Sequence, residues 1–186
     1  MTEVSSLTGR LLVATPALAD PNFDRAVVLL LDHDQEGSLG VVLNRPTPVG
    51  VGDILEGWAE LTGEPGVVFQ GGPVSLDSAL GVAVIPGEEG PLGWRRVHGA
   101  IGLVDLEAPP ELLAAALGSL RIFAGYSGWG PGQLDDELSD GAWYVVESEP
   151  GDISSPSPEG LWRAVLRRQR SKLAVIATYP DDPSLN

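Results

Sequence analysis

The sequence has no cysteine, only two histidines, and no apolar run longer than AVVLLL at 26–31. Without cysteine the chain forms no disulfide and offers no thiolate for nucleophilic catalysis or zinc binding. A run this short is far below the roughly 20 residues that cross a bilayer. The first ten residues, MTEVSSLTGR, lack the basic and apolar regions of a signal peptide. We therefore expect a cytoplasmic protein with no membrane partner.

Basic residues are also scarce, because 11 Lys and Arg stand against 26 Asp and Glu, for a net charge of −15. Five of the 11 fall within 163–172, which leaves six bases among all the acids in the rest of the chain. Nucleic-acid binding depends on Lys and Arg that neutralise phosphates. Direct binding of DNA or RNA is therefore disfavoured, except through that one basic segment.

What the chain does have is a core-forming composition, with 43% hydrophobic residues in 186, punctuated by 24 glycines and 16 prolines. This predicts one turn-rich domain spanning 1–186. Apolar runs predict strands at 10–15, 26–32, 38–44, 67–70, 79–85, 121–127, 142–148 and 173–179, with one or two more in 94–106. Helical patterns cover 51–61, 109–118, 132–141 and 158–170. The order lacks a regular βαβ alternation, so the fold class is α+β.

The last predicted helix, 158–170, begins after a candidate N-cap, Ser157, with Pro158 at its first position. Its arginines recur at a spacing of three to four residues, and Trp162 and its apolar neighbours supply another face. An amphipathic helix docked on its own acidic domain explains this pattern. Binding of an acidic protein or a nucleic acid is the second interpretation.

The stretch GYSGWGPGQLDDEL at 125–138 allows three interpretations. A nucleophile elbow needs G-x-S-x-G, but Trp129 stands where its last glycine belongs, and both histidines precede Ser127. A phosphate cradle needs a basic residue, and this loop has none. A structural turn remains, in which Tyr126 and Trp129 fill a core, while Gln133 and Glu137 share a helix face.

This structural interpretation covers two glycine-rich pieces of the chain. We assign architectural roles to Gly71, Gly72, Pro73, Gly125, Tyr126, Gly128, Trp129, Gly130 and Gln133. Replacing Ser127 by Ala is expected to be nearly silent, whereas replacing Gly128 or Trp129 is expected to destabilise the protein. No catalytic residue follows from this stretch.

Asp32, His33 and Asp34 form a local cluster of metal-ligand types that includes a histidine. In an extended strand the two aspartates point away from the histidine, so a solvated hairpin end is the favoured interpretation. The other histidine, His98, lies beside two arginines with no matching ligand and is assigned to a strand end. We predict neither a metal nor a cofactor.

Two polar clusters interrupt the apolar sequence at the ends of paired strands. DPNFDR at 20–25 precedes the strand 26–32, and NRP at 44–46 follows the strand 38–44. A hairpin places both clusters at its open end, where they form either a network that fixes the fold or a cleft for an anionic ligand. The candidate ligand-binding residues are Asn22, Asp24, Arg25, Asn44 and Arg45, with His33 as a further member.

Several pieces in combination resemble the AlgH/YqgE family of small bacterial proteins. The matching stretches are 9–46 with its DPNF and NRP motifs, FQGGPVSLDSALGV at 69–82, RIFAGYSGWGPGQLDDEL at 121–138 and LWRAVL at 161–166. The resemblance implies a bifurcated, mostly antiparallel sheet that curls into a pseudo-barrel flanked by a few helices. Family members commonly have Ala at the position of Ser127, which argues against a nucleophilic serine.

The resemblance brings no established activity, although some members carry a transcriptional-regulator label. We see no helix-turn-helix here, and a charge of −15 suits an operator-binding protein poorly. The leading hypothesis is a non-enzymatic regulatory or interaction protein that acts indirectly, through a protein or a small ligand. The alternative is a small-ligand-binding protein or hydrolase with a cleft near the DPNFDR and NRP loops.

Overall fold

The computed structural model describes residues 6–18, 20–87, 89–169 and 173–178. Its strands are β1 (Leu11–Ala14), β2 (Val27–Asp34), β3 (Gly37–Val42), β4 (Pro46–Gly50), β5 (Val67–Gln70), β6 (Val74–Val84), β7 (Trp94–His98), β8 (Ile101–Val104), β9 (Ser119–Trp129) and β10 (Trp143–Val146). Its α-helices are α1 (Glu111–Ala114), α2 (Gln133–Ser139), α3 (Leu161–Arg167) and α4 (Leu173–Ile176). Short 3₁₀ turns lie at Val51–Asp53, Ala59–Leu61, Pro150–Asp152 and Pro158–Gly160.

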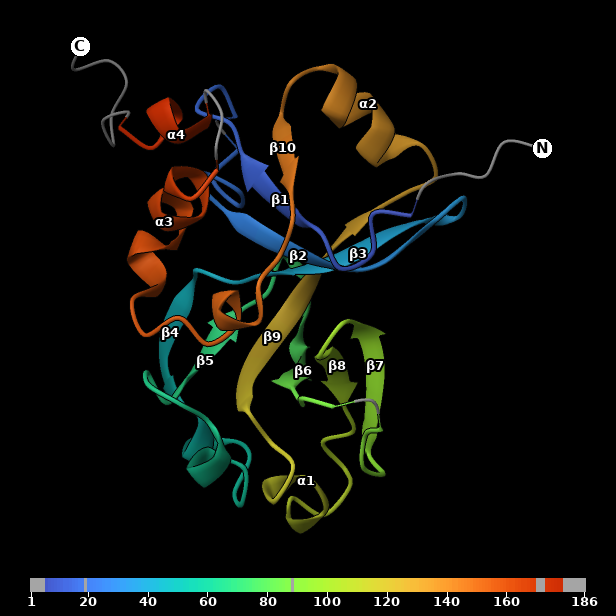
Figure 1. The fold of residues 1–186 in the computed structure, drawn as a ribbon, viewed down its shortest axis with the longest axis vertical. Helices are drawn as coiled ribbons and strands as arrows, with labels where there is room; N and C mark the ends of the chain where they lie inside the picture. The colour runs from blue at the N-terminus through green and yellow to red at the C-terminus, as the bar shows by residue number, and fades with distance from the viewer. Residues whose placement is uncertain (1–5, 19, 88, 170–172, 179–186) are drawn as a thin grey trace.

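Strand β9 joins two halves of the molecule (Figure 1). Its last residues pair with β3, which continues the order β3-β2-β1-β10. Its earlier residues pair antiparallel with β6, followed by β8 and β7, and parallel with β5, which in turn pairs with β4. The sheet therefore divides at β9 and curls into a half-barrel. The α+β fold with a bifurcated, mostly antiparallel pseudo-barrel is confirmed.

The hairpin of β2 and β3 lies at the centre of the core because both of its faces are buried. Leu29 and Val41 face the central cluster of apolar side chains, while Val28 and Val42, on the opposite face, pack with the aromatic residues beneath α2. A continuous apolar run is typical of a strand that is covered on both sides. The predicted hairpin of 26–32 and 38–44 is correct, although its turn is tighter than expected.

Helices cover the two faces of this upper half (Figure 1). Helix α2 inserts Leu134 into the cluster that contains Trp129 and Trp143. Helix α3 buries Leu161, Trp162, Val165 and Leu166 in the central core. The apolar face of the predicted basic helix therefore docks on its own domain, while Arg170 and Lys172 lie outside the described residues.

The predicted final strand at 173–179 is wrong, because residues 173–176 form helix α4. The apolar side chains follow a helical period: Leu173 and Ile176 pack on the central core and Ala177 is buried, whereas Val175 is 63% exposed. Short apolar runs do not distinguish a strand from a helix without such burial information. Tyr179, at the end of the predicted strand, lies outside the described residues.

Two predicted helices are much shorter than their patterns suggest. Segment 51–61 contains only two 3₁₀ turns, separated by Gly57 in a left-handed conformation with φ of 92°. Segment 109–118 is α-helical only over Glu111–Ala114, and the Gly118 N–H then donates to the Val84 carbonyl. Pairing with β6 therefore begins at Gly118, the residue at which the predicted helix ends. Ser157, the predicted N-cap of the last helix, makes no capping hydrogen bond through its side chain.

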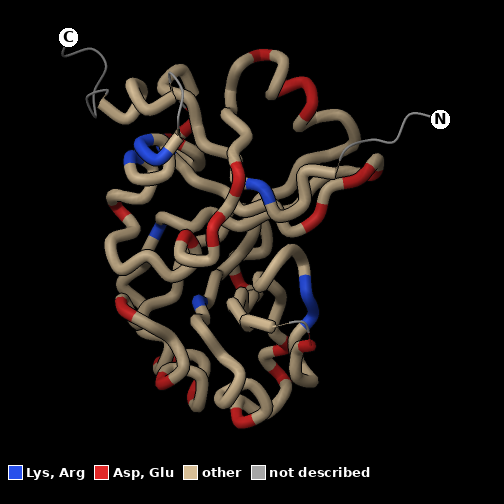
Figure 2. The backbone as a smooth tube through the Cα atoms, in the orientation of Figure 1, with Lys and Arg blue, Asp and Glu red and all other residues tan. Residues whose placement is uncertain are grey.

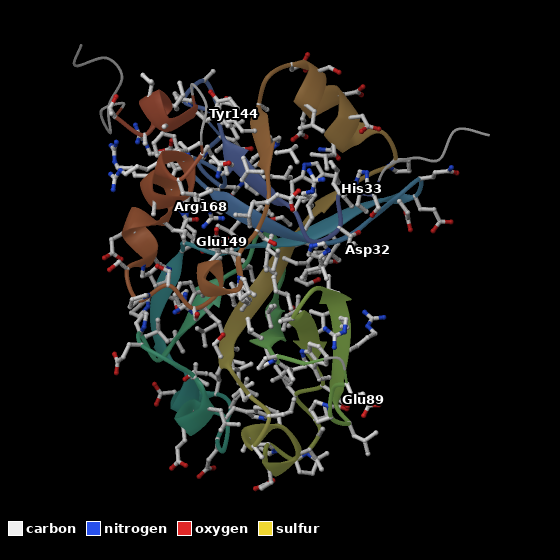
Figure 3. All side chains as sticks on the ribbon, in the orientation of Figure 1. Asp32, His33, Glu89, Tyr144, Glu149 and Arg168 are labelled. Atoms are coloured by element: carbon white, nitrogen blue, oxygen red, sulfur yellow. The ribbon has the colours of Figure 1, made fainter. Side chains whose placement is uncertain are left out.

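A part-buried ion pair joins α3 to the segment after β10. Arg168, at the end of α3, donates to both carboxylate oxygens of Asp152, at 2.6 and 2.8 Å. Glu149 lies 3.4 Å from the same guanidinium, and Figure 3 shows both residues at this junction. Asp152 is only 4% exposed and also accepts the Glu149 N–H at 2.7 Å. The hydrogen bonds that Arg168 donates to Asp152 raise the pKa of the Arg168 guanidinium, so the pair holds its charge.

Replacing Asp152 by Ala should therefore lower the free energy of unfolding by about 2–3 kcal/mol, since it removes a two-point charged contact and leaves a backbone donor unsatisfied. Glu147→Ala is the matched control, because its pairing with Arg10 at 3.0 Å is exposed and is worth about 0–1 kcal/mol. Urea denaturation of the three proteins measures both changes. Equal effects of the two substitutions would contradict a locking role for Asp152.

Candidate functional site

A small polar pocket of about 210 Å³ lies between the DPNFDR loop, the NRP turn and the glycines after β5. Its lining residues come from three separate pieces of sequence. They are Pro21, Asn22, Val42, Arg45, Gln70, Gly72 and Pro73. The open end of the β2–β3 hairpin thus brings DPNFDR and NRP together, as the sequence predicts, and the QGGP segment completes the wall.

Asn44 fixes the two loops that form one side of this pocket. Its side-chain oxygen accepts the Val27 N–H at 3.0 Å, and its amide nitrogen donates to the Arg25 carbonyl at 2.9 Å. The Arg45 guanidinium donates a hydrogen bond to the Asp24 carbonyl at 2.5 Å and a longer hydrogen bond to the Pro21 carbonyl at 3.5 Å. These contacts all reach backbone atoms, so NRP holds the shape of the DPNFDR loop.

The glycines after β5 form the opposite side because no side chain fits there. A Cβ on Gly71 would lie 2.4 Å from the Gly125 carbonyl oxygen, and one on Gly72 would lie 2.2 Å from that of Tyr126. The Gly71 N–H donates to Ala124, and its carbonyl accepts the Val42 N–H. The QGGP segment therefore lies directly on the backbones of β3 and β9.

Backbone strain occurs on both sides of the pocket. Arg25 and Ser75, with φ of 53° and 50°, are the non-glycine residues with positive φ in the described part of the chain. Such conformations cost about 1–3 kcal/mol each and gather at binding and active sites. Arg25 follows the DPNF loop, and Ser75 comes two residues after Pro73, so both strained residues adjoin the pocket walls.

The chemistry of the lining is that of a hydrogen-bond donor site. The side chains of Asn22 and Gln70 make no hydrogen bond within the described residues, and the Arg45 guanidinium uses only part of its donor capacity. The lining contains no carboxylate. An arginine and two free amides suit an anionic or acceptor-rich ligand, and the volume is below that of most drug-sized sites.

Three of the predicted site residues are placed differently. The Arg25 guanidinium turns away from the pocket and lies 4.4 Å from the centroid of the Trp162 ring. His33 is at the opposite, turn end of the β2–β3 hairpin, 8% exposed, with Nδ1 2.7 Å from Ser38 Oγ. Asp24 contributes its carbonyl, and the turn is capped by Asp20, which accepts the Asn22 N–H at 2.9 Å.

Gln70 is the pocket residue that sequence reasoning missed. It ends a short predicted strand, and its side chain had no polar neighbour in sequence to mark it. The available signal was the QGGP junction itself, since glycines after a strand often mark a close approach of two backbones. The parallel pairing of β5 with β9 then carries Gln70 to the loops near Asn22.

Ser127 is completely buried in β9, and its hydroxyl donates to the Gly71 carbonyl at 3.0 Å. That contact links β9 to the glycines beside the pocket. In the described chain this hydroxyl has no histidine partner. The geometry is that of a structural hydrogen bond between two strands rather than of an activated nucleophile.

Glu137 organises the rest of the GWGPGQLDDEL stretch. One carboxylate oxygen accepts the indole N–H groups of Trp129 and Trp143, at 3.1 and 2.9 Å. The other accepts the Gln133 amide at 3.0 Å, and Gln133 in turn accepts the Gly130 N–H. Phe23 of the DPNF motif packs on both indoles, with centroids 6.2 and 5.5 Å away. The two motifs therefore meet in one aromatic cluster.

A buried cation, Arg121, joins two loops to the lower half of β9. It is 3% exposed and donates to the carbonyls of Glu64 and Ser155, at 3.2 and 3.0 Å, while its guanidinium lies 4.3 Å from the Phe69 centroid. Burial lowers the pKa of Arg121 to about 10, so the side chain stays charged at neutral pH. It does not line the polar pocket.

Other site classes find little support in the described residues. Asp32 and Asp34 are exposed, whereas His33 between them is buried, so the three side chains do not converge. Within residues 6–18, 20–87, 89–169 and 173–178, no three potential metal ligands cluster. Over those same ranges, no helix has the length and apolar character to cross a bilayer. Acidic residues are spread over most of the tube, whereas basic ones gather at α3 and β7 (Figure 2).

Comparison with known proteins identifies close relatives. Residues 11–174 match the family described as AlgH-like. A UPF0301 protein of Streptomyces avermitilis is 87% identical, covering 100% of this chain and 98% of the relative, and one from Thermobifida fusca is 50% identical, covering 97% and 96%. The crystal structure of DIP2367 from Corynebacterium diphtheriae is similar, with 30% identity, a TM-score of 0.89 and coverage of 96% and 95%. The solution structure of AlgH from Pseudomonas aeruginosa has 28% identity, a TM-score of 0.68 and coverage of 97% and 98%.

Three substitutions rank the contributions of the GYSGWG segment. Ser127→Ala should cost at most about 1 kcal/mol, because the Gly71 carbonyl keeps the Val42 N–H. Trp129→Ala should cost about 3–5 kcal/mol by opening the aromatic cluster. Gly128→Ala should change stability by less than about 0.5 kcal/mol, since its Cβ would meet only Tyr126 at 3.8 Å. This corrects the expectation that replacing Gly128 destabilises the protein.

Thermal and urea melts of the three variants measure this order. A Ser127→Ala protein that loses several kcal/mol would show that the hydroxyl holds more than one strand contact.

Asn44→Ala should destabilise the protein by about 2–3 kcal/mol, because it removes the acceptor of the buried Val27 N–H and the side-chain donor to the carbonyl of strained Arg25. Asn22→Ala is the matched control, since the Asn22 side chain has no partner in the described structure and should cost less than about 0.5 kcal/mol. Urea denaturation compares the two. A large loss of stability in Asn22→Ala would indicate that this amide is structural.

Proposed function

The chain belongs to the AlgH-like family, and on that premise we propose that it is a non-enzymatic binding protein for a small anionic or acceptor-rich ligand. The ligand occupies the polar pocket, and any effect on transcription is indirect, through the ligand or a protein partner. The protein acts in the cytoplasm. Neither a metal nor a cofactor takes part in this proposal.

The observation that carries the proposal is the convergence of the signature motifs on one pocket. DPNF supplies Asn22, NRP supplies Arg45, and QGGP supplies Gln70 and Gly72. Structural demands explain Asn44 and the glycines, since each holds a strand or allows a close backbone approach. They do not explain the free amides of Asn22 and Gln70, which are directed at the pocket without a partner among the described residues.

A binding role fits the lining better than a catalytic one. General acid–base and nucleophilic chemistry need a nucleophile within hydrogen-bond reach of a base. The lining offers amides, a guanidinium and glycine backbone instead. The Ser127 hydroxyl donates its hydrogen bond to the Gly71 carbonyl. These groups recognise and orient a ligand.

Indirect action is favoured over direct reading of DNA by the distribution of charge. The net charge of −15 repels the phosphate backbone of a nucleic acid. Within the basic segment, Arg168 is paired with Asp152, and Arg163 donates to the Ala177 carbonyl and lies over Trp162. Salt-sensitive, sequence-specific DNA binding by the purified protein, measured by fluorescence anisotropy, would overturn this part of the proposal.

Ligand binding is tested by thermal melts in inorganic phosphate and in small carboxylates such as malonate. A ligand at 100 times its Kd adds about 2.7 kcal/mol, which corresponds to a Tm rise of about 5–10 °C in a domain of this size. The double variant Asn22→Ala/Gln70→Ala should melt at the parental temperature without ligand and lose most of that rise.

Gln35→Ala is the matched control, since it removes an exposed amide at the far end of the β2–β3 hairpin. It should keep the full ligand-induced shift, which separates pocket binding from general salt stabilisation by phosphate. The pocket is not the site if the double variant and Gln35→Ala respond alike, and the proposal fails if none of these anions shifts the parental melt with concentration.

A further inference from the structure

A second and larger groove, of about 520 Å³, opens between the β2–β3 hairpin and strands β7 and β8. It shares no lining residue with the polar pocket. Strand β7 pairs only with β8 in the described sheet, so the half-barrel remains open along this side. Outside this lining, Gly9 of the chain before β1 packs against the His98 ring. The groove is the mouth of the half-barrel, a usual place for ligands in β-barrels.

The floor of the groove is apolar and belongs to the main core. Leu39, Leu80 and Leu103 are only partly buried and pack against the central cluster. Buried Leu31 lies among them, and Tyr126 forms part of the lining. A ligand lying here would cover these leucines and gain hydrophobic stabilisation in proportion to the area removed from water.

One lip of the groove is cationic, although the protein is strongly acidic. Arg95 and Arg96 stand on β7, where Figure 2 shows one of the few basic segments. Arg96 is engaged, because it donates to the Gly87 carbonyl at 3.0 Å and to Gly99, and it lies over the Trp94 ring. Arg95 is exposed and makes no hydrogen bond or ion pair within the described structure. Its guanidinium is therefore available to an anion at the lip.

The other lip carries a carboxylate. Asp32 is exposed on β2 and borders the groove, and Figure 3 labels it where the hairpin crosses above the lower half. The groove therefore has an apolar leucine floor, a guanidinium on one lip and a carboxylate on the other. The two charged groups can each contact one end of an elongated ligand. Its volume lies within the range of about 300–1,000 Å³ typical of small-molecule sites.

We propose that this groove binds an elongated amphiphile with an anionic head group. The apolar body lies over Leu39, Leu80 and Leu103, and the head group pairs with Arg95. Asp32 favours ligands that carry a hydrogen-bond donor or a cation at the far end and disfavours a second anion there. This site is independent of the small-anion pocket proposed above.

The test is an NMR titration of the ¹⁵N-labelled protein with octanoate, 1-octanol and 8-aminooctanoate, which share a chain length and differ in their ends. Octanoate should shift the amide signals of β3, β7 and β8 and bind at least about tenfold more tightly than octanol, as a charge-assisted contact implies. The 8-aminooctanoate should bind more tightly than octanoate in the parent and lose that advantage in Asp32→Asn.

Arg95→Ala should reduce octanoate binding to the level of octanol, whereas Arg167→Ala, which removes an exposed arginine on α3, should leave it unchanged. Leu103→Trp should fill the groove and abolish binding of all three probes, with its fold checked by circular dichroism. The proposal is overturned if the probes leave β3, β7 and β8 unshifted, or if octanol and octanoate bind equally. An Arg95→Ala protein that retains the parental preference for octanoate also overturns it, whether or not Leu103→Trp folds.

Discussion

The close approach of the QGGP segment to strand β9 is the constraint on which the rest of the structure depends. Backbone lies on backbone at Gly71 and Gly72, with no space for a Cβ, and the Ser127 hydroxyl and the Ala124 carbonyl bridge the contact. This allows β9 to pair with β3, β5 and β6 along one length. The β5 branch therefore leaves β9 at the glycines, while β9 continues to its pairing with β3.

The two candidate sites follow from that division. Where β5 leaves β9, the glycines leave a gap that the DPNFDR and NRP loops close, and this gap is the polar pocket. Where the curled sheet fails to close between β7 and the β2–β3 hairpin, the half-barrel keeps an open apolar mouth. Loops held by Asn44 form the walls of the polar pocket, whereas strands form the walls of the groove. We therefore expect the second to be the more rigid of the two.

Sequence patterns predicted the parts of this fold that depend on local periodicity. The continuous apolar runs of β2 and β3 predict a hairpin with DPNFDR and NRP at its open end, so Asn22 and Arg45 could be foreseen as neighbours. The side-chain direction of Arg25 could not be predicted, because its left-handed backbone turns the guanidinium onto Trp162. The position of His33 at the turn end of the hairpin was predictable, and it argues against a place in the pocket at the open end. Gln70 and the leucine groove depend on pairings of strands distant in sequence, and helix α4 depends on burial against α3. Neither kind of information is present in a local pattern.

The charge of the protein also limits what either site can bind. Acidic residues outnumber basic ones by 26 to 11, so the long-range field opposes the approach of any anion. Beyond about 8 Å this field is screened at physiological ionic strength, so short-range contacts within each site, including those at Arg45 and Arg95, discriminate between ligands. Selectivity must therefore come from shape at short range: a narrow pocket with two amides in one case, and a leucine floor in the other. A polyanion such as nucleic acid meets the opposing field along its whole length, whereas a ligand with a single anionic group meets it only once.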